Sequence, residues 1–176
     1  MKYTKTIASL LLTSCLGLNV ASAQQLDRDQ ISTSCLIAYT TEARDQRGGG
    51  AQIRALIRQG LANANEALDN SFVGIHWGEG SIIQVDYDDS TLTTAVTTLS
   101  EWTDGDEINT VEGTTVDEHV EERFLDVQCL ITDWSGSETG LARVLGRHCI
   151  VGIEAVEFLT MAHELSHLYN LSLIHI

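Results

Sequence analysis

The sequence predicts an α/β fold in which helices cover a mixed β-sheet, and three observations lead to this class. First, short β-prone apolar runs alternate along the chain with segments of helical periodicity. Second, turn-forming residues separate these segments, as in the glycine run at 48–50. Third, 176 residues with 43% hydrophobic content are enough for a buried core, and neither an internal repeat nor a linker divides them. We therefore expect one α/β domain.

The first two elements have the clearest patterns. Residues 34–40 (SCLIAYT) are a short apolar, β-prone run, followed by a polar, glycine-rich loop. Residues 51–70 are predicted to form a helix, because apolar side chains recur there at helical spacing. These side chains are Ile53, Ile57, Leu61, Ala64 and Leu68.

The remaining elements are shorter. Strand segments are expected at 71–78 and 81–87, and two short helices at 91–102 and 117–124 around an acidic loop. Residues 126–132 (DVQCLIT) predict a buried strand. Two further strands are expected at 139–145, on an open edge of the sheet, and at 148–154. A final helix is expected at 156–169.

The N-terminus has the pattern of an export signal. Lys2 and Lys5 precede a mostly apolar segment at 7–20, and Ala21-Ser22-Ala23 provides the small residues at which signal peptidase cleaves. The apolar segment is too short and too interrupted to span a bilayer, so we expect no stable membrane insertion. Residues 1–23 are therefore predicted to be a signal peptide, and the protein to be secreted.

The cysteines leave two alternatives open. Leu12-Thr13-Ser14-Cys15 resembles a bacterial lipobox, but a lipid anchor at Cys15 is less favoured because the preceding apolar stretch is short and a good cleavage site follows. The secreted chain would keep Cys35, Cys129 and Cys149, an odd number for an exported protein. Either one disulfide forms and one thiol stays free, or a partner lies outside this sequence.

The charge is strongly acidic. The chain has a formal net charge of −15, and loss of residues 1–23 would leave eight arginines and no lysine against all 25 acidic residues. Thirteen carboxylates lie between residues 86 and 126, with Arg123 as the one basic partner. Such a field repels phosphate backbones and argues against a nucleic-acid partner.

We interpret this acidic stretch as a solvated face, with calcium binding or solubility in salty surroundings as alternatives. Residues 104–113 (DGDEINTVEG) start like a calcium loop. They lack the fifth-position ligand, the following glycine and the terminal glutamate of an EF-hand, so no specific motif supports Ca2+.

The chemistry-bearing motif is His163-Glu164-Leu165-Ser166-His167, the HExxH spacing. On a helix, two histidines four residues apart lie on one face and can bind the same metal ion. The glutamate can take a proton from a zinc-bound water and pass it to the leaving amine. The alternative is that this segment is an ordinary amphipathic helix whose two half-exposed histidines bind no metal ion.

Four segments follow the order found in a known family: residues 35–71, 82–90 (IIQVDYDDS), 126–146 and 158–167 (FLTMAHELSH). Through them, nearly all of the chain after the signal peptide resembles the bacterial, secreted reprolysin-like (adamalysin-like) metzincin zinc metalloproteases. The resemblance implies a metzincin-like three-layer sandwich with a twisted mixed sheet and an HExxH active-site helix. The lower subdomain would be missing from this chain.

The same resemblance implies the site residues. His163 and His167 would be ligands of one catalytic Zn2+, and Glu164 would be the general base. The edge strand at Gly140, Leu141 and Ala142 would bind an extended peptide by strand addition.

The motif departs from the metzincin pattern HExxHxxGxxH after its second histidine. Asn170 stands where glycine is usual, although asparagine tolerates a left-handed turn. Leu173 stands where the third histidine is expected, and His175 comes two residues late. The family's later methionine turn and the wall of its specificity pocket are absent.

Residues 171–176 (LSLIHI) match the translation of a transposase adaptor used in preparing sequencing libraries, so we expect a non-native tail after Asn170. Sequencing the genomic locus past the Asn170 codon tests this expectation. We predict a histidine or aspartate three residues beyond Asn170 and a methionine turn further on. A genomic reading of LSLIHI followed by a stop codon would contradict it.

The sequence is thus interpreted as an incomplete fragment of a secreted zinc metalloendopeptidase. Residues 24–170 would be its catalytic domain, a monomer acting on a peptide or protein substrate. Because a catalytic zinc site has three protein ligands, the 176-residue chain is expected to bind zinc weakly and to lack activity. One alternative is a zincin of another branch with a downstream acidic third ligand. The other is a non-enzymatic acidic exported binding module, which would have no need of Glu164.

Overall fold

The computed structural model describes residues 31–88, 94–104, 108–134, 139–157 and 159–171. The strands are β1 (Ile31–Tyr39), β2 (Ile75–Asp86), β3 (Asn109–Thr110), β4 (Val127–Thr132), β5 (Gly140–Ala142) and β6 (His148–Gly152). The helices are α1 (Thr41–Gln46), α2 (Gly50–Asn70), α3 (Ala95–Thr103), α4 (Val116–Arg123) and α5 (Thr160–His167), with a 3-10 turn η3 (Ile153–Ala155). The expected signal peptide, Cys15 and residues 172–176, with Leu173 and His175, lie outside the described residues. No described helix is long and apolar enough to cross a membrane.

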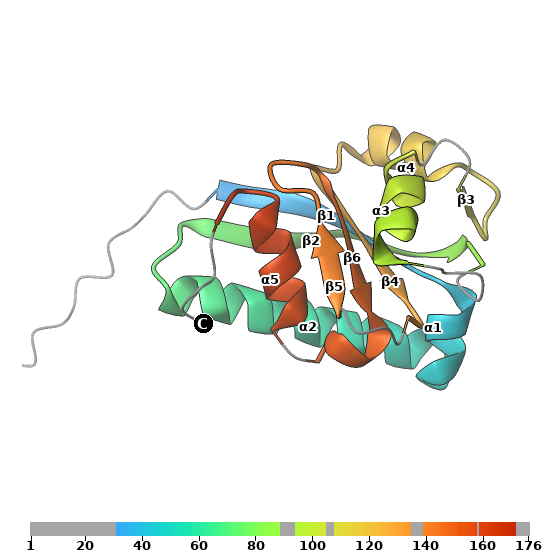
Figure 1. Ribbon diagram of the computed structural model, residues 1–176, viewed down its shortest axis with the longest axis horizontal. Coiled ribbons are helices and arrows are strands. Elements are labelled where there is room, and N and C mark those ends of the chain that lie inside the picture. Colours follow the sequence, from blue (N-terminus) through green and yellow to red (C-terminus); the bar gives the residue numbers. More distant parts are fainter. Residues whose placement is uncertain (1–30, 89–93, 105–107, 135–138, 158, 172–176) are drawn as a thin grey trace, which may run out of the picture.

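The strands form one mixed sheet in the order β3-β2-β1-β4-β6-β5 (Figure 1). β1, β2, β4 and β6 pair in parallel, whereas β3 and β5 pair antiparallel at the two edges. β1 and β4 contain most of the residues predicted as strands at 34–40 and 126–132. The mixed α/β fold predicted from the sequence is therefore confirmed.

Helices cover both faces of the sheet and make three layers (Figure 1). On β1, Cys35 and Ile37 pack in the core cluster that contains α2 and α5. Leu36 and Ala38 face the other way, into the cluster that contains α3 and α4. Because both faces are buried, β1 and β4 are apolar on successive residues and do not alternate with polar ones.

Helix α2 agrees closely with its sequence periodicity. It runs over Gly50–Asn70, and the five predicted apolar positions are all buried. Gly60 on this helix faces the segment that leads into α5: a Cβ atom there would lie 3.1 Å from Val156 Cγ1 and 3.3 Å from Met161 Sδ. Glycine therefore allows this segment to lie directly on α2.

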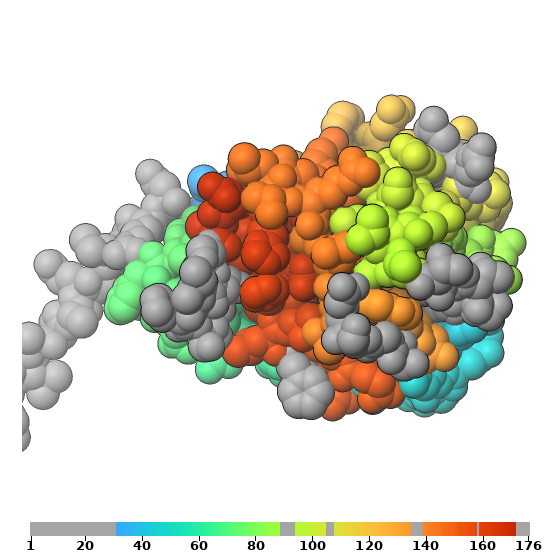
Figure 2. Space-filling view, in the orientation of Figure 1, coloured from blue at the N-terminus to red at the C-terminus, as the bar shows by residue number. Residues whose placement is uncertain are grey.

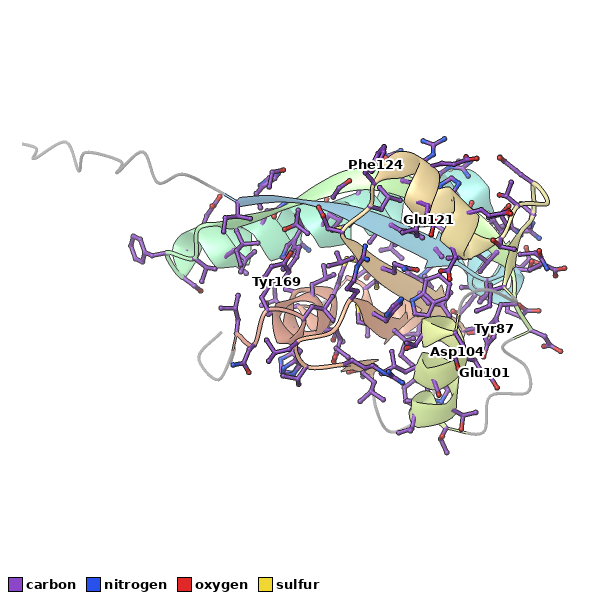
Figure 3. All side chains as sticks on the ribbon, turned by 90° about the horizontal axis from the view of Figure 1, so that it is seen from above. Tyr87, Glu101, Asp104, Glu121, Phe124 and Tyr169 are labelled. Carbon is purple, nitrogen blue, oxygen red and sulfur yellow. The ribbon has the colours of Figure 1, made fainter. Side chains whose placement is uncertain are left out.

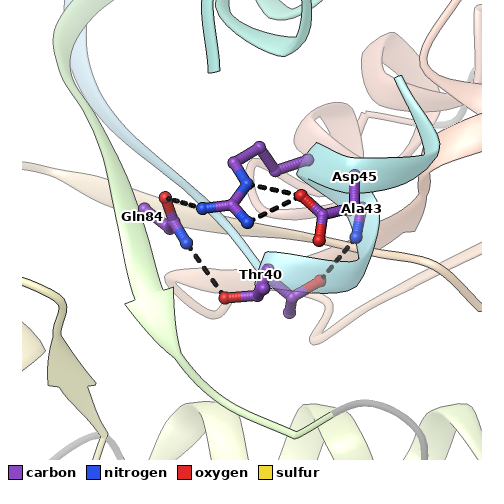
Figure 4. Close-up of polar contacts among 6 residues, drawn as sticks. Thr40, Ala43, Asp45 and Gln84 are labelled. Carbon is purple, nitrogen blue, oxygen red and sulfur yellow. Dashed lines mark hydrogen bonds and ion pairs between the residues drawn. The ribbon is translucent and has the colours of Figure 1, made fainter. Parts of the chain in front are cut away.

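Helix α1 occupies part of the region that the sequence predicted as a loop. The Thr40 hydroxyl caps it by accepting from the Ala43 N–H at 3.2 Å. Arg44 bonds both Asp45 at 2.7 Å and the Gln84 side chain of β2 at 3.3 Å (Figure 4). Gln84 also donates to the Thr41 hydroxyl at 2.9 Å. This short helix is thus held by a cap and by contacts from a distant strand.

Strand β2 is one continuous strand where two segments were predicted. Its pairing with β1 places Cys35 opposite Glu79 and Leu36 opposite Ser81, so Gly80 is a bulge and not a chain break. Residues 71–74 are not strand, because Ser71 caps α2 and Phe72 has a φ of 57°. The bulge allows pairing to continue through the glycine.

The two helices on the acidic side are close to their predicted ranges. α3 starts at Ala95 after the Thr94 cap, and α4 starts at Val116 with a capping box made by Thr115 and Glu118. The two-residue strand β3 in the acidic loop between them was not predicted. Its pairing with the end of β2 needs no apolar run, so the sequence offers little signal for it.

The cysteines that remain after the expected cleavage site are free and fully buried. Cys129 lies directly beside Cys149 in the parallel register of β4 and β6. A hydrogen bond with Cys129, together with burial, raises the pKa of the Cys149 thiol, and burial raises that of Cys35. The raised pKa values favour neutral thiols at Cys35 and Cys149. All three cysteines are free in the structure, which differs from the alternative of one disulfide and one free thiol.

Candidate metal centre

The HExxH residues lie on α5, which is shorter than the predicted helix at 156–169. The turn η3 precedes it, and the helix begins at Thr160 and ends at His167. Met161, Ala162 and Leu165 are buried in the core cluster shared with α2. Figure 2 shows α5 (red) reaching the surface beside the segment of β5 (orange). The helix is thus anchored by one face and open on the other.

The two histidines lie together on the open face. Their Nε2 atoms are 2.9 Å apart, and the rings meet edge to face with centroids 4.5 Å apart. Partial burial and the neighbouring His167 lower the pKa of His163, which favours the neutral imidazole that binds metals. Because Zn–N bonds are about 2.0–2.1 Å long, two nitrogens at this separation can share one ion. The pair therefore fits Zn2+.

Glu164, between the histidines in sequence, turns inward. Its side chain packs against Gly140 of β5, and only 6% of the residue is exposed. Burial raises the pKa of this carboxyl from its ordinary value of 4.5 to about 7. The site thus holds a carboxyl that can both take up and release a proton near neutral pH.

Glu164→Gln is expected to stabilise the metal-free protein at pH 8 by about 1–3 kcal/mol. The folded protein holds the Glu164 proton more tightly than the unfolded chain, since the folded pKa is about 7 and the ordinary value is 4.5. The stability from this group is therefore fully present below pH 4.5 and is lost as the pH rises through 7. Glutamine is neutral and avoids that loss.

Urea unfolding with a chelator at pH 5 and pH 8 measures this effect. At pH 5 the difference in stability between the two proteins should be much smaller than at pH 8. Glu121→Gln on the exposed side of α4 is the control and should change stability by less than about 0.5 kcal/mol at either pH. An equal gain from Glu164→Gln at both pH values would contradict the prediction.

Strand β5 lies at the edge of the sheet, with Gly140 paired to Val151 and Ala142 paired to Cys149. It is shorter than the predicted strand at 139–145, because the chain turns after Ala142 and Leu145 has a φ of 57°. The Leu145 N–H donates to the His167 carbonyl at 3.2 Å. The β5–β6 hairpin is thereby tied to the end of α5.

The end of α5 is a Schellman motif, in which Asn170 takes the left-handed position with a φ of 54°. The Leu171 N–H donates to the Ser166 carbonyl and the Asn170 N–H to the His167 carbonyl, both at 3.0 Å. Asn170 thus makes the left-handed turn that asparagine was expected to tolerate at this position. This turn leads the chain away from the helix axis directly after the second histidine.

Tyr169 holds this turn against the sheet. Its hydroxyl is 3.0 Å from the Thr33 hydroxyl, and its ring meets Trp77 edge to face at a centroid distance of 5.2 Å. None of these three residues was predicted from the sequence to support the motif. Their contacts join residues 92 and 136 positions apart, and the one local signal was an aromatic residue two positions after the motif.

Among the described residues, no group of three or more His, Cys, Asp and Glu side chains could hold a metal ion. Within the part of the chain that the structure describes, the two predicted ligands therefore come together without a third. Leu173 and His175, on which the prediction of the missing ligand depends, lie outside the described residues.

The acidic stretch is separate from this site. Figure 3 shows Glu101 and Asp104, near Tyr87, well apart from Tyr169 at the end of α5. Tyr87 donates a hydrogen bond to Glu101. Glu101 and Asp104 therefore lie on the side of the sheet covered by α3 and α4, away from the end of α5.

No protein-family model matches this chain, and no curated protein sequence matches it. Several solved structures are similar to it, among them the two described next. A chain in a structure of a chaperone–substrate complex has a TM-score of 0.65 and 18% identity, over 79% of this chain and 26% of that chain. Archaemetzincin from Methanopyrus kandleri has a TM-score of 0.43 and 14% identity, over 83% of this chain and 77% of that chain.

The first similarity shows a shared fold only, and this chain spans about a quarter of the length of that neighbour. The second is too low to define a common fold. The fold and the site together define an α/β protein with an HExxH motif on a half-buried helix beside the edge strand β5.

Proposed function

We propose that residues 24–170 are the catalytic domain of a secreted, monomeric, metzincin-like zinc metalloendopeptidase. The observation that carries the proposal is the arrangement on α5. Two histidine nitrogens converge to 2.9 Å on its open face, and the carboxyl between them is buried against an edge strand. The chemistry requires this combination of two neutral nitrogen ligands and a carboxyl that is not itself a ligand.

His163 and His167 would hold Zn2+ through Nε2. When bound, the ion would supply a Lewis acid that polarises the scissile carbonyl and lowers the pKa of water. Glu164 would accept the proton of the attacking water and return it to the leaving amine, a role for which a pKa of about 7 is well suited. An extended peptide would pair with the open edge of β5.

A third zinc ligand and the rest of the substrate cleft would come from outside the described residues. The acidic stretch would remain a solvated face that repels nucleic acid, and no specific motif supports calcium binding there.

The proposal is tested first by metal affinity. His163→Ala or His167→Ala is expected to lower the affinity of the full-length protein for Zn2+ by more than about 100-fold, because even the loss of a residue that only supports a ligand costs 10–100-fold. Competition with a chromogenic chelator measures this affinity.

His119→Ala is the matched control for metal affinity, since His119 bonds Ser81 at 2.9 Å and lies on α4. It should leave zinc affinity within about twofold of the wild-type value, as expected for a residue that is neither a ligand nor a ligand's support. Equal affinities in all three variants would rule out the histidine pair as the zinc site. A zinc-loaded full-length protein that cleaves no peptide would rule out the peptidase.

A further inference from the structure

Gly140 is the point at which the edge strand touches the motif helix. A Cβ atom built on Gly140 would lie 2.7 Å from Glu164 Cγ, 2.8 Å from Oε1 and 3.0 Å from Cδ. The φ of Gly140 lies outside the left-handed region, so the backbone there does not require glycine. What requires it is the space that Glu164 occupies.

The contact includes Cγ as well as the end of the side chain. The position of Cγ is set by χ1 alone, and a helical residue has two favourable χ1 rotamers. A methyl group on residue 140 would therefore force Glu164 into another rotamer or push α5 away from β5. Either change moves the carboxyl from its place against the edge strand.

The surroundings leave little room for such a shift. Glu164 is 6% exposed, and its neighbours Leu165 and Ser166 are fully buried. The Ser166 hydroxyl donates to the Ala162 carbonyl at 2.7 Å, and Leu145 N–H binds the His167 carbonyl at 3.2 Å. The first bond lies within α5, and the second ties the β5–β6 hairpin to the end of this helix.

We infer that Gly140 is a positioning residue for Glu164: it lacks a side chain so that the carboxyl can lie between α5 and the edge strand. This inference rests on the proposed role of Glu164 as the general base. It gives Gly140 a function distinct from the backbone pairing with substrate that the sequence implied.

A double-mutant cycle tests the contact in the 176-residue chain, without metal and without activity. Gly140→Ala should lower the equilibrium constant for folding at least tenfold in the wild-type background. In the Glu164→Ala background the obstructing side chain is gone. There, Gly140→Ala should lower the equilibrium constant for folding by less than threefold. Gly78→Ala is the control, because its Cβ would meet Thr33 O at an ordinary 3.4 Å. It should have the same effect in both backgrounds.

Steady-state kinetics of the zinc-loaded full-length protein test the positioning role. Gly140→Ala should lower kcat at least tenfold and leave KM within threefold and zinc content unchanged, because a small misplacement of a reacting group is costly. A role in substrate pairing alone would raise KM and spare kcat, and that result would overturn the inference.

The inference would also be overturned if Gly140→Ala lowered the equilibrium constant for folding equally in the wild-type and Glu164→Ala backgrounds. An inactive wild-type protein would refute the proposed peptidase and with it the positioning role, whereas the stability cycle would still report whether the two residues are in contact. Failure of the inference and failure of the proposed function are therefore distinguishable.

Discussion

Glu164→Gln is expected to lower kcat/KM for peptide hydrolysis by about 10²–10⁴-fold in the full-length protein, while zinc stays bound. Glutamine has nearly the same shape, so it can keep the packing against Gly140 and leave both histidines in place. It cannot accept a proton, so the attacking water loses its base. The loss corresponds to about 3–5 kcal/mol of transition-state stabilisation.

A quenched fluorescent peptide and a zinc assay on the same preparations measure this effect. Glu154→Gln is the matched control, because Glu154 lies on η3 and its carboxylate is 3.7 Å from Arg47, away from the histidines. It should retain nearly full activity. Near-normal turnover of Glu164→Gln would refute the role of general base, and loss of zinc in that variant would indicate a role as a ligand.

Trp77→Ala is expected to destabilise the protein by about 3–5 kcal/mol, the usual cost of truncating a buried aromatic side chain. Trp77 is 1% exposed. Asn65 holds its backbone with bonds of 2.8 and 2.9 Å, and its ring supports Tyr169 at 5.2 Å. The substitution therefore leaves a cavity beneath the turn that ends the motif helix.

Urea unfolding followed by circular dichroism measures this loss. Trp77→Phe keeps an aromatic ring and should cost clearly less. Tyr169→Phe keeps the ring contact and removes only the hydroxyl bonded to Thr33, so it should cost about 1 kcal/mol. A loss below about 1 kcal/mol for Trp77→Ala would show that the ring carries little of the packing.

Local patterns were enough to predict the elements that a single periodicity defines. The apolar spacing of α2 gave its range to within one residue, since a helix in contact with a sheet must bury one continuous stripe. The apolar run of β4 was predicted equally well, because a central parallel strand is buried on both faces. The spacing of His163 and His167 was also sufficient to place both rings on one face of α5, because residues four positions apart on a helix lie on the same face.

Elements that depend on distant partners were missed or misjudged. Helix α1 has only Ala43 buried and is held by Arg44 and Gln84, which are 40 positions apart. Strand β2 was divided at Gly80, because a glycine in an apolar run indicates a turn and a bulge equally well. Helix α5 was extended back to Val156, because a 3-10 turn and a helix have similar local patterns.

The sequence by itself determined the class of fold, and it identified the two histidines and the glutamate of the motif. Each of these follows from the spacing of residues that are close together in the chain. Only the tertiary structure decided that Glu164 turns inward against Gly140, that Tyr169 anchors the turn after the motif, and that Cys129 lies beside Cys149. The physical reason is that these contacts depend on strand order and on close packing between segments far apart in the chain. No local periodicity encodes such contacts.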